Sequence, residues 1–214
     1  MKKILSVLLV IALCAAMLTV FTGCGNEADK VIGTWRGEVD MTGIINDELA
    51  ADPTLAGYFN ISDFRVTMVM TFNEDGTYYS TIDADSVQAA MEGMIADMAD
   101  GIYAMFEDEL AASGLDMSVE ELLEMSGMTM DDVMYEMTAA LDTGVIDMVV
   151  AEATLEGNYE VKGDKLFLSD GLDYAVDPSV YEVISVDGST LTLKESVGGE
   201  ADTFGVYPVV FTKD

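Results

Sequence analysis

The sequence predicts an α+β protein, in which an antiparallel up-and-down β-barrel of about eight strands carries an inserted helical subdomain. Two observations predict this class. On either side of the central part of the chain, apolar and polar residues alternate with a period of two, as they do in half-buried strands. Between about residues 84 and 153 the apolar residues instead recur every three or four positions, which is typical of helices that bury one face.

The first part of the barrel is predicted over residues 31–83. A strand from 31 to 41 places its larger apolar side chains on one face, and these include Trp35, the single Trp of the chain. Strands over 63–72 and 77–82 flank the sequence Asn-Glu-Asp-Gly, whose Gly can adopt the positive φ of a tight turn. These two strands therefore form a hairpin, and we expect Trp35 to be buried at one end of the barrel.

The helical subdomain is predicted over residues 84–153, which contain no Pro and are rich in Ala, Met, Glu and Asp. Ser118 stands three positions before Glu121, and Thr129 stands three positions before Asp132. In such a capping box the hydroxyl and the carboxylate each accept a hydrogen bond from a backbone N–H at the start of a helix. The segment therefore predicts three or four helices between two strands.

The barrel is completed over residues 154–214, where the period of two returns. Asp187 and Gly188 are a strong signal for a two-residue hairpin turn. Pro208 lacks the N–H of a ladder hydrogen bond, so its strand is expected at an edge, a bulge or a seam. The predicted strands cover residues 155–161, 165–169, 180–186, 190–194 and 204–212.

The N-terminus has the pattern of a secretory signal. A basic start with two Lys precedes an apolar run from Ile4 to about Val20, and small residues follow up to Gly23 and Cys24. The end of this segment resembles the lipobox of bacterial lipoproteins. A signal anchor or an ordinary secretory signal is the alternative interpretation.

The lipobox resemblance implies that residues 1–23 are a signal peptide and that Cys24 becomes the lipidated N-terminus, with palmitate or a similar acyl chain. Residues 24–30 are then a membrane-proximal linker. We therefore expect an extracytoplasmic protein that is lipid-anchored to the bacterial cell membrane.

The formal net charge of −31 at pH 7 excludes several classes of partner. The phosphates of nucleic acids would repel such a chain, so no nucleic acid partner is expected. An anionic lipid surface would repel it as well, so membrane contact is expected to come from the N-terminal lipid and not from a basic face.

The residue types of common catalytic sites are missing. The chain contains no His, and its only Cys residues are Cys14, in the segment expected to be removed, and Cys24. Ser-His-Asp catalysis, Cys-His catalysis and the common zinc ligand sets are therefore excluded. We expect a protein that is not an enzyme and that holds no cofactor or metal.

Methionine is the unusual residue, because 11 of the 16 Met fall in the predicted helical subdomain. Most of them follow helical spacing, which favours the filling of a core. Met also lines adaptable apolar grooves. A third, less favoured interpretation is a copper site, because thioethers are soft ligands that suit Cu(I). The residues grouped for such a site are Met125, Met128, Met130 and Met134.

Four short motifs resemble the lipocalin-like domains of bacterial lipoproteins, namely Gly33-Thr34-Trp35, Phe72 to Tyr78, Gly157-Asn158-Tyr159 and Leu191-Thr192-Leu193. The resemblance covers residues 31–83 and 154–213. In lipocalins the Gly-x-Trp strand closes one end of the barrel, often with an Arg of the last strand against the Trp. The counterpart of that Arg in this chain is Lys213.

We therefore expect a non-enzymatic lipoprotein that binds a small apolar ligand, in the barrel or between the barrel and the helices. The alternative is an interaction module of the cell envelope, whose helical insert docks another envelope protein. The candidate ligand-binding residues are Trp35, Met68, Met70, Tyr79, Tyr159, Met98, Met105 and Met134.

Overall fold

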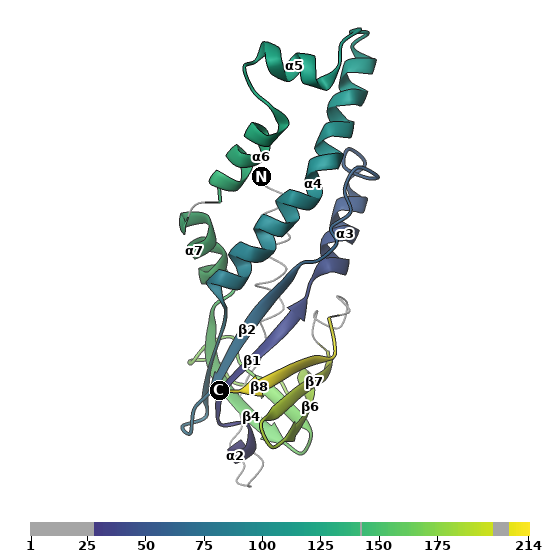
Figure 1. Ribbon diagram of the computed structural model, residues 1–214. Coiled ribbons are helices and arrows are strands. Elements are labelled where there is room, and N and C mark those ends of the chain that lie inside the picture. Colours follow the sequence, from purple (N-terminus) through teal and green to yellow (C-terminus); the bar gives the residue numbers. More distant parts are fainter. Residues whose placement is uncertain (1–27, 142, 199–205) are drawn as a thin grey trace. The chain divides into compact units, whose positions relative to one another are not determined.

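The computed structural model describes residues 28–141, 143–198 and 206–214 (Figure 1). The expected signal peptide and Cys24 lie outside this part of the chain, as does most of the expected linker. The last residues of that linker belong to a short helix, α2 (Ala28–Val31).

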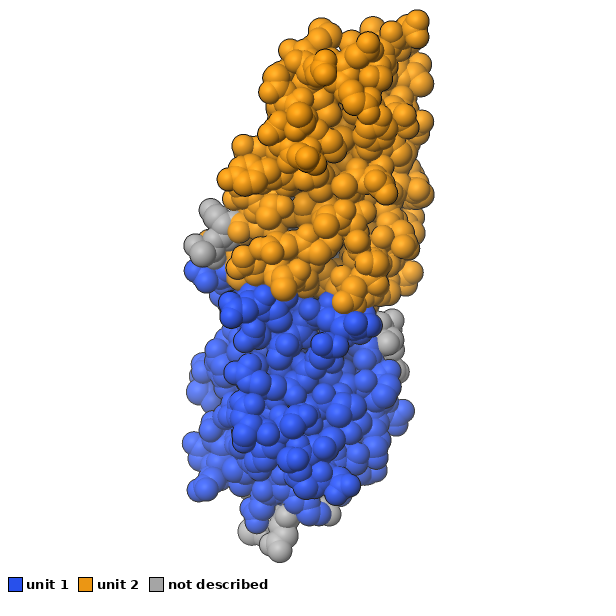
Figure 2. Space-filling view, in the orientation of Figure 1, with its two compact units in different colours: residues 1–40, 65–87, 147–214 blue, residues 41–64, 88–146 orange. Residues whose placement is uncertain are grey.

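The described residues form two compact units, which Figure 2 draws in different colours. The barrel unit comprises the described residues up to Asp40, residues 65–87 and the described residues from Asp147 onward. The helical unit comprises residues 41–64 and 88–146. Each unit is therefore assembled from segments that are far apart in the sequence.

The strands of the barrel unit form a closed antiparallel barrel, as the sequence predicted. Each strand pairs with the next one along the chain, and β1 pairs with β8 to complete the ring. Closure leaves no free strand edge for pairing with other chains. The strands are β1 (Gly33–Asp40), β2 (Arg65–Phe72), β3 (Thr77–Ile82), β4 (Leu155–Lys162), β5 (Lys165–Leu168), β6 (Tyr181–Asp187), β7 (Thr190–Val197) and β8 (Val209–Lys213).

The two ends of the barrel carry different connections. Short turns join β2 to β3, β4 to β5 and β6 to β7, and all of them lie at the end where β1 begins, called here the turn end. Helix α2 enters at the turn end as well. Because β1 and β3 run in the same direction, the long segments that follow them, residues 41–64 and 83–154, both start at the opposite end.

The alternation predicted for β1 is present. Its odd-numbered residues from Trp35 to Val39 are buried and the even-numbered residues between and after them are exposed. Four strands, β1, β2, β6 and β8, begin one or more residues later than the sequence predicted. Val31 ends helix α2, so β1 begins at Gly33. β8 begins at Val209, directly after Pro208, because Pro cannot donate a ladder hydrogen bond.

Two inward-facing glycines show how closely the barrel interior is packed. A Cβ atom built at Gly37 would lie 2.7 Å from the ring of Phe211, and one built at Gly157 would lie 2.8 Å from the ring of Tyr78. Both rings are almost completely buried. Aromatic rings of the chain itself therefore occupy the space beside these glycines, as expected of a densely packed core.

The remaining helices occupy the long connections. Ser118 and Thr129 both form the predicted capping boxes, with Glu121 and Asp132 as their partners. Within the described residues, no helix is both long and apolar enough to cross a membrane. The helices are α3 (Thr42–Ala51), α4 (Ala84–Ala112), α5 (Val119–Met125), α6 (Met130–Ala139) and α7 (Thr143–Glu152).

The helical unit also includes α3 and the segment after it, although the sequence analysis placed both in the first part of the barrel. Asn46 fixes the far end of this segment, because its side-chain amide exchanges two hydrogen bonds of 2.8 Å with the backbone of Ile61. Ser62 then donates from its N–H and its hydroxyl to the carboxylate of Asp97 in α4. These contacts hold residues 41–64 on α4 within the helical unit.

Candidate functional site

Trp35 lies at the turn end of the barrel and is completely buried. Its indole Nε1–H donates a hydrogen bond of 2.5 Å to the carbonyl oxygen of Val31, the last residue of α2. The Nζ atom of Lys213 lies 5.1 Å from the centre of the Trp35 ring, within the range of a cation–π interaction. The contact that the lipocalin resemblance implied for Lys213 is therefore present, and it joins the last strand to the first.

Aromatic residues surround the same part of the barrel, and their hydroxyls are already bonded. Phe72 meets Tyr159 edge-on, with 5.0 Å between ring centres. The hydroxyl of Tyr78 donates to the Ser169 carbonyl at 2.8 Å, and that of Tyr159 donates at 2.9 Å to a backbone carbonyl of the β2–β3 turn. Burial, and to a lesser extent the charge of Asp170, raises the pKa of Tyr78 well above its ordinary value. Both hydroxyls therefore act as structural donors.

The barrel unit contains five of the candidate ligand-binding residues, and they do not share one environment. Trp35, Met70 and Tyr159 are buried in the interior. Met68 is half-buried. Tyr79 is 41% exposed and alternates with buried neighbours on β3, so it lies on the outer face of the barrel. Only Met68 combines an inward position in the strand alternation with partial exposure.

Polar groups also occupy inward positions, and the sequence pattern did not indicate them. Ser80 and Ser196 are both 3% exposed, and Glu182 lies opposite Ser196 in the strand register. A β-bulge between Val183 and Ile184 shifts the pairing of β6 with β7 and so changes which residues face inward. An alternation count that runs straight through the bulge therefore misses Ser196.

The other three candidate residues belong to the helical unit. Met98 and Met105 lie on α4, and Met134 lies on α6. All three are half-buried. Met98 and Met105 are two helical turns apart and therefore share one face of α4.

The helical unit leaves much of its apolar surface only partly covered. One of its buried clusters consists of Leu110, Val119 and Leu123, and Tyr103, Phe106, Met130 and Val133 pack against this cluster, but α6 itself has no residue that is fully buried. Residues 102–106 of α4 are apolar on every side of the helix, and all are only half-buried. Apolar residues of α6 at helical spacing form a half-buried surface, called here the α6 face, which consists of Met130, Val133, Met134 and Met137.

The helical unit has no positive side chain. Its sequence contains eighteen Asp and Glu residues and no Lys or Arg. Hydroxyl groups take the place of cations at some carboxylates, since Tyr58 donates to Asp108 and Tyr103 donates to Glu120 at 2.6 Å. The bond to Glu120 is the largest cause that raises the pKa of Tyr103, to about 12, and it lowers the pKa of Glu120.

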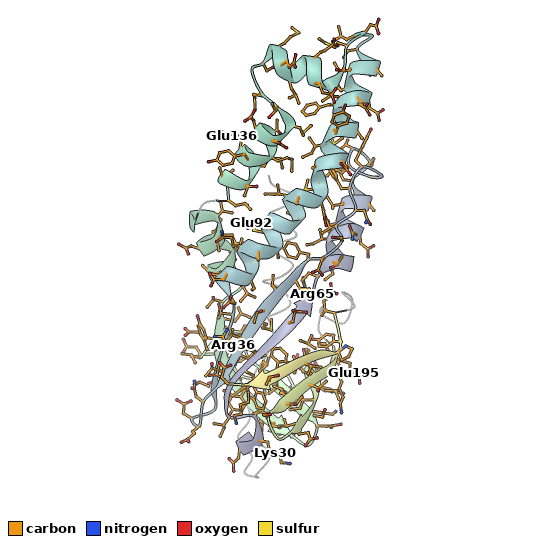
Figure 3. All side chains as sticks on the ribbon, viewed as in Figure 1. Lys30, Arg36, Arg65, Glu92, Glu136 and Glu195 are labelled. Carbon is orange, nitrogen blue, oxygen red and sulfur yellow. The ribbon has the colours of Figure 1, made fainter. Side chains whose placement is uncertain are left out.

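The cations of the described chain are all in the barrel unit. Figure 3 labels Lys30 on α2, Arg36 on β1 and Arg65 on β2, and it labels Glu92 and Glu136 on α4 and α6. Among the described residues, no group of three or more His, Cys, Asp or Glu side chains is arranged to hold a metal ion.

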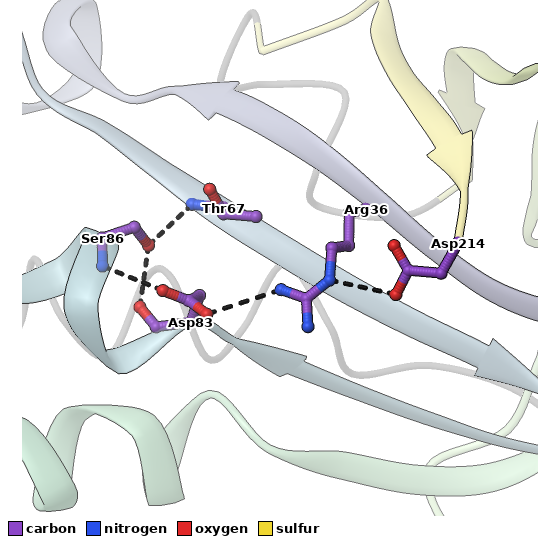
Figure 4. A network of polar contacts seen from close by, with 5 residues as sticks. All are labelled: Arg36, Thr67, Asp83, Ser86 and Asp214. Carbon is purple, nitrogen blue, oxygen red and sulfur yellow. Dashed lines mark hydrogen bonds and ion pairs between the residues drawn. The ribbon is translucent and has the colours of Figure 1, made fainter.

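A polar network on the outside of the barrel fixes the point where α4 begins (Figure 4). Arg36 binds the carboxylates of Asp83 and Asp214, at 3.5 and 3.1 Å. Asp83 in turn accepts a hydrogen bond from the N–H of Ser86, and the Ser86 hydroxyl bonds the backbone of Asp83 and Thr67. The ion pairs are exposed and contribute little stability, so the network mainly sets the geometry of the first turn of α4.

These features define a class of protein: an α+β chain with a closed, eight-stranded up-and-down barrel of the lipocalin-like kind and a helical insertion. No family model matches the sequence, and no curated protein or solved structure was found to be similar to it. Membership of the lipocalin-like lipoproteins therefore stays a prediction from the four sequence motifs and the barrel topology.

Proposed function

We propose that this chain is a non-enzymatic, lipid-anchored lipoprotein of the cell envelope, in which the barrel is a scaffold and the helical unit docks another envelope protein. The observation that carries this proposal is the contrast in packing between the units. The barrel interior holds completely buried aromatic residues, whereas α6 buries none of its residues.

The packing of the barrel supports a scaffold. Phe211 and Tyr78 occupy the space left by Gly37 and Gly157, and Trp35 is held by a hydrogen bond and a cation. A ligand at this level of the barrel would have to displace these side chains. Densely packed interiors resist such displacement, because the lost contacts and the strain both cost free energy.

The packing of the helical unit supports docking. Residues that are apolar on all sides of a helix are normally buried, but residues 102–106 of α4 are only half-buried. Met side chains adapt their shape to a partner and are common at surfaces that bind other proteins. Met130 and Val133 of the α6 face pack against the core of the unit, whereas Met134 and Met137 are half-buried and leave some apolar area that a partner could cover.

A second candidate function is the binding of a small apolar ligand in the barrel. Met68 favours it, because this side chain is at an inward position and yet half-buried. The up-and-down barrel topology is also that of ligand-binding lipocalin-like domains. The two candidates make different predictions about what accompanies the protein during purification.

Native mass spectrometry of the protein, extracted gently from membranes and then delipidated, separates the two candidates. We expect a stable complex with a second protein, since the proposal requires a partner. A preparation that carries a bound small molecule and no protein partner would overturn the docking proposal in favour of the ligand-binding one.

The membrane anchor is tested by replacing Cys24, which the lipobox resemblance identifies as the lipidated residue. Cys24→Ala should release the protein from membranes or leave its signal peptide uncleaved, because the thiol that receives the lipid is lost. Cell fractionation with an immunoblot reports both outcomes, and Met125→Ala, an exposed change in α5, is the control. Normal cleavage together with unchanged membrane retention would contradict the anchor.

A further inference from the structure

We propose that the loop between β5 and β6, residues 169–180, binds an Arg side chain on an extended segment of another protein. This site lies in the barrel unit and is independent of the docking function proposed for the helical unit. Three properties of the barrel support it. The loop holds two exposed apolar side chains in fixed positions, carboxylates flank them, and cations already lie over other aromatic rings of the barrel.

The β5–β6 loop is fixed to the outside of the barrel at two points. The side-chain amide of Asn158, at an outward position of β4, donates to the carbonyl oxygens of Leu172 and Tyr174 at 2.9 and 3.4 Å. Further along the loop, Val176 belongs to a buried cluster with Phe167 of β5. Before this second point, Leu172 and Tyr174 remain 52% and 61% exposed. A loop that is already ordered presents such side chains to a partner at little further cost in entropy.

The ring of Tyr174 is held in place as well. A Cβ atom built at Gly171 would lie 3.2 Å from the ring carbon Cδ2, so the ring lies against the backbone of Gly171. The Tyr174 N–H also donates to the Gly171 carbonyl oxygen at 3.2 Å. The loop therefore supports one part of the ring and leaves the rest in solvent, as a group that stacks on the ring requires.

The charges beside this ring select the kind of group that can bind. The loop contains three Asp and no Lys or Arg, and Asp170 and Asp173 are exposed within four positions of Tyr174. Carboxylates repel an anionic ligand and accept hydrogen bonds without donating any. A ligand at the exposed ring must therefore supply the donors, and a positive charge on it is favoured.

Other aromatic rings of the barrel show the contact that a cation makes here. The Nζ atom of Lys165 lies 3.8 Å from the centre of the Tyr181 ring, and Lys213 lies over Trp35. Within the described parts of the chain, no cation lies over Tyr174. A cation from outside the chain would give this ring the same favourable contact.

Arg matches this surface better than Lys does. Its planar guanidinium group stacks on an aromatic ring, and its fork of donors can bind a carboxylate such as that of Asp173. Its aliphatic part can lie along Leu172. A second copy of the chain is disfavoured as the source, because its only two Arg, Arg36 and Arg65, already pair with carboxylates of their own barrel.

Surface plasmon resonance with the full chain in a neutral detergent, passed over immobilised short peptides, tests the inference. The probe peptide carries Arg residues separated by Gly. One control peptide has Lys in place of each Arg, and a second has citrulline, which keeps the planar group but has no charge. We expect binding to be strongest for the Arg peptide, weaker for the Lys peptide and absent for the citrulline peptide. Equal binding of the Arg and Lys peptides, or of the Arg and citrulline peptides, would overturn the inference.

Substitutions in the loop locate the site. Tyr174→Ala should weaken binding of the Arg peptide about two- to fivefold, the equivalent of one exposed cation–π contact, whereas Tyr174→Phe keeps the ring and should bind as the parent does. Asp173→Asn should also weaken binding. Asp187→Asn is the matched control, because it removes an exposed charge from the β6–β7 turn and Asn suits that turn equally well. Unchanged binding by Tyr174→Ala, or equal losses at positions 173 and 187, would show that charge alone attracts the peptide and would overturn the inference.

Discussion

Replacing Trp35 with Ala is expected to lower the free energy of unfolding by about 3–5 kcal/mol, the usual cost of deleting a buried large aromatic side chain. Trp35 is completely buried, so the change leaves a cavity in the barrel. It also removes the donor to the Val31 carbonyl and the ring that faces Lys213. Because the total stability of a domain is typically about 5–15 kcal/mol, this single change should bring the barrel close to unfolding.

Urea unfolding monitored by circular dichroism measures this effect, since the substitution removes the only Trp and with it the fluorescence signal. Val210→Ala is the control, because Val210 lies on β8 and is 53% exposed. We expect the control to change the unfolding free energy by less than about 0.5 kcal/mol. A Trp35→Ala protein that unfolds at nearly the parent urea concentration would refute the role given to Trp35.

Replacing Gly157 with Ala is expected to destabilise the barrel by about 1–3 kcal/mol or more, because the new methyl group overpacks a filled site. The Cβ atom would lie 2.1 Å from the carbonyl oxygen of Ser169 and 2.8 Å from the Tyr78 ring. The same carbonyl accepts the hydroxyl of Tyr78, so moving it away also disturbs a buried hydrogen bond. The carbonyl oxygen of Ser169 belongs to the backbone, so it cannot move aside as easily as the end of a flexible side chain could.

The same substitution at Gly93 is the matched control and should have the opposite sign. Gly93 lies in α4, and beyond the neighbouring backbone of the helix itself no atom lies within 4 Å of its Cβ position, so nothing is displaced. Ala is favoured over Gly inside a helix by about 0.5–1 kcal/mol. Thermal unfolding of both variants compares the two effects. If the Gly157→Ala protein were as stable as the Gly93→Ala protein, the barrel interior would be shown to accommodate the added methyl group without displacement of its neighbours.

Local patterns in the sequence were sufficient to predict the strands and helix starts that depend on near neighbours. β3 begins and ends where the alternation predicted, and the turn before it has Gly76 at φ 84°. The capping boxes at Ser118 and Thr129 also involve only residues three positions apart. In each case the interaction that fixes the element is contained in the segment from which it was predicted.

Features that depend on distant residues were not predictable in this way. The fold of residues 41–64 depends on Asn46 meeting Ile61 and on Ser62 meeting Asp97. The inward position of Ser196 depends on a bulge in the pairing of two strands. Among the candidate site residues, the alternation of β3 could have shown that Tyr79 points outward, because Tyr78 and Ser80 take the inward positions.

The uneven distribution of cations has a consequence for proteolysis. Trypsin-like proteases cleave after Lys or Arg, and no such residue occurs between Arg65 and Lys162. Most of the helical unit, including α4, α5 and α6, therefore offers these proteases no cleavage site, whether it is folded or unfolded. A trypsin-like protease can attack the chain only at the barrel and near the N-terminus, so digestion would release the greater part of the helical unit as one intact fragment.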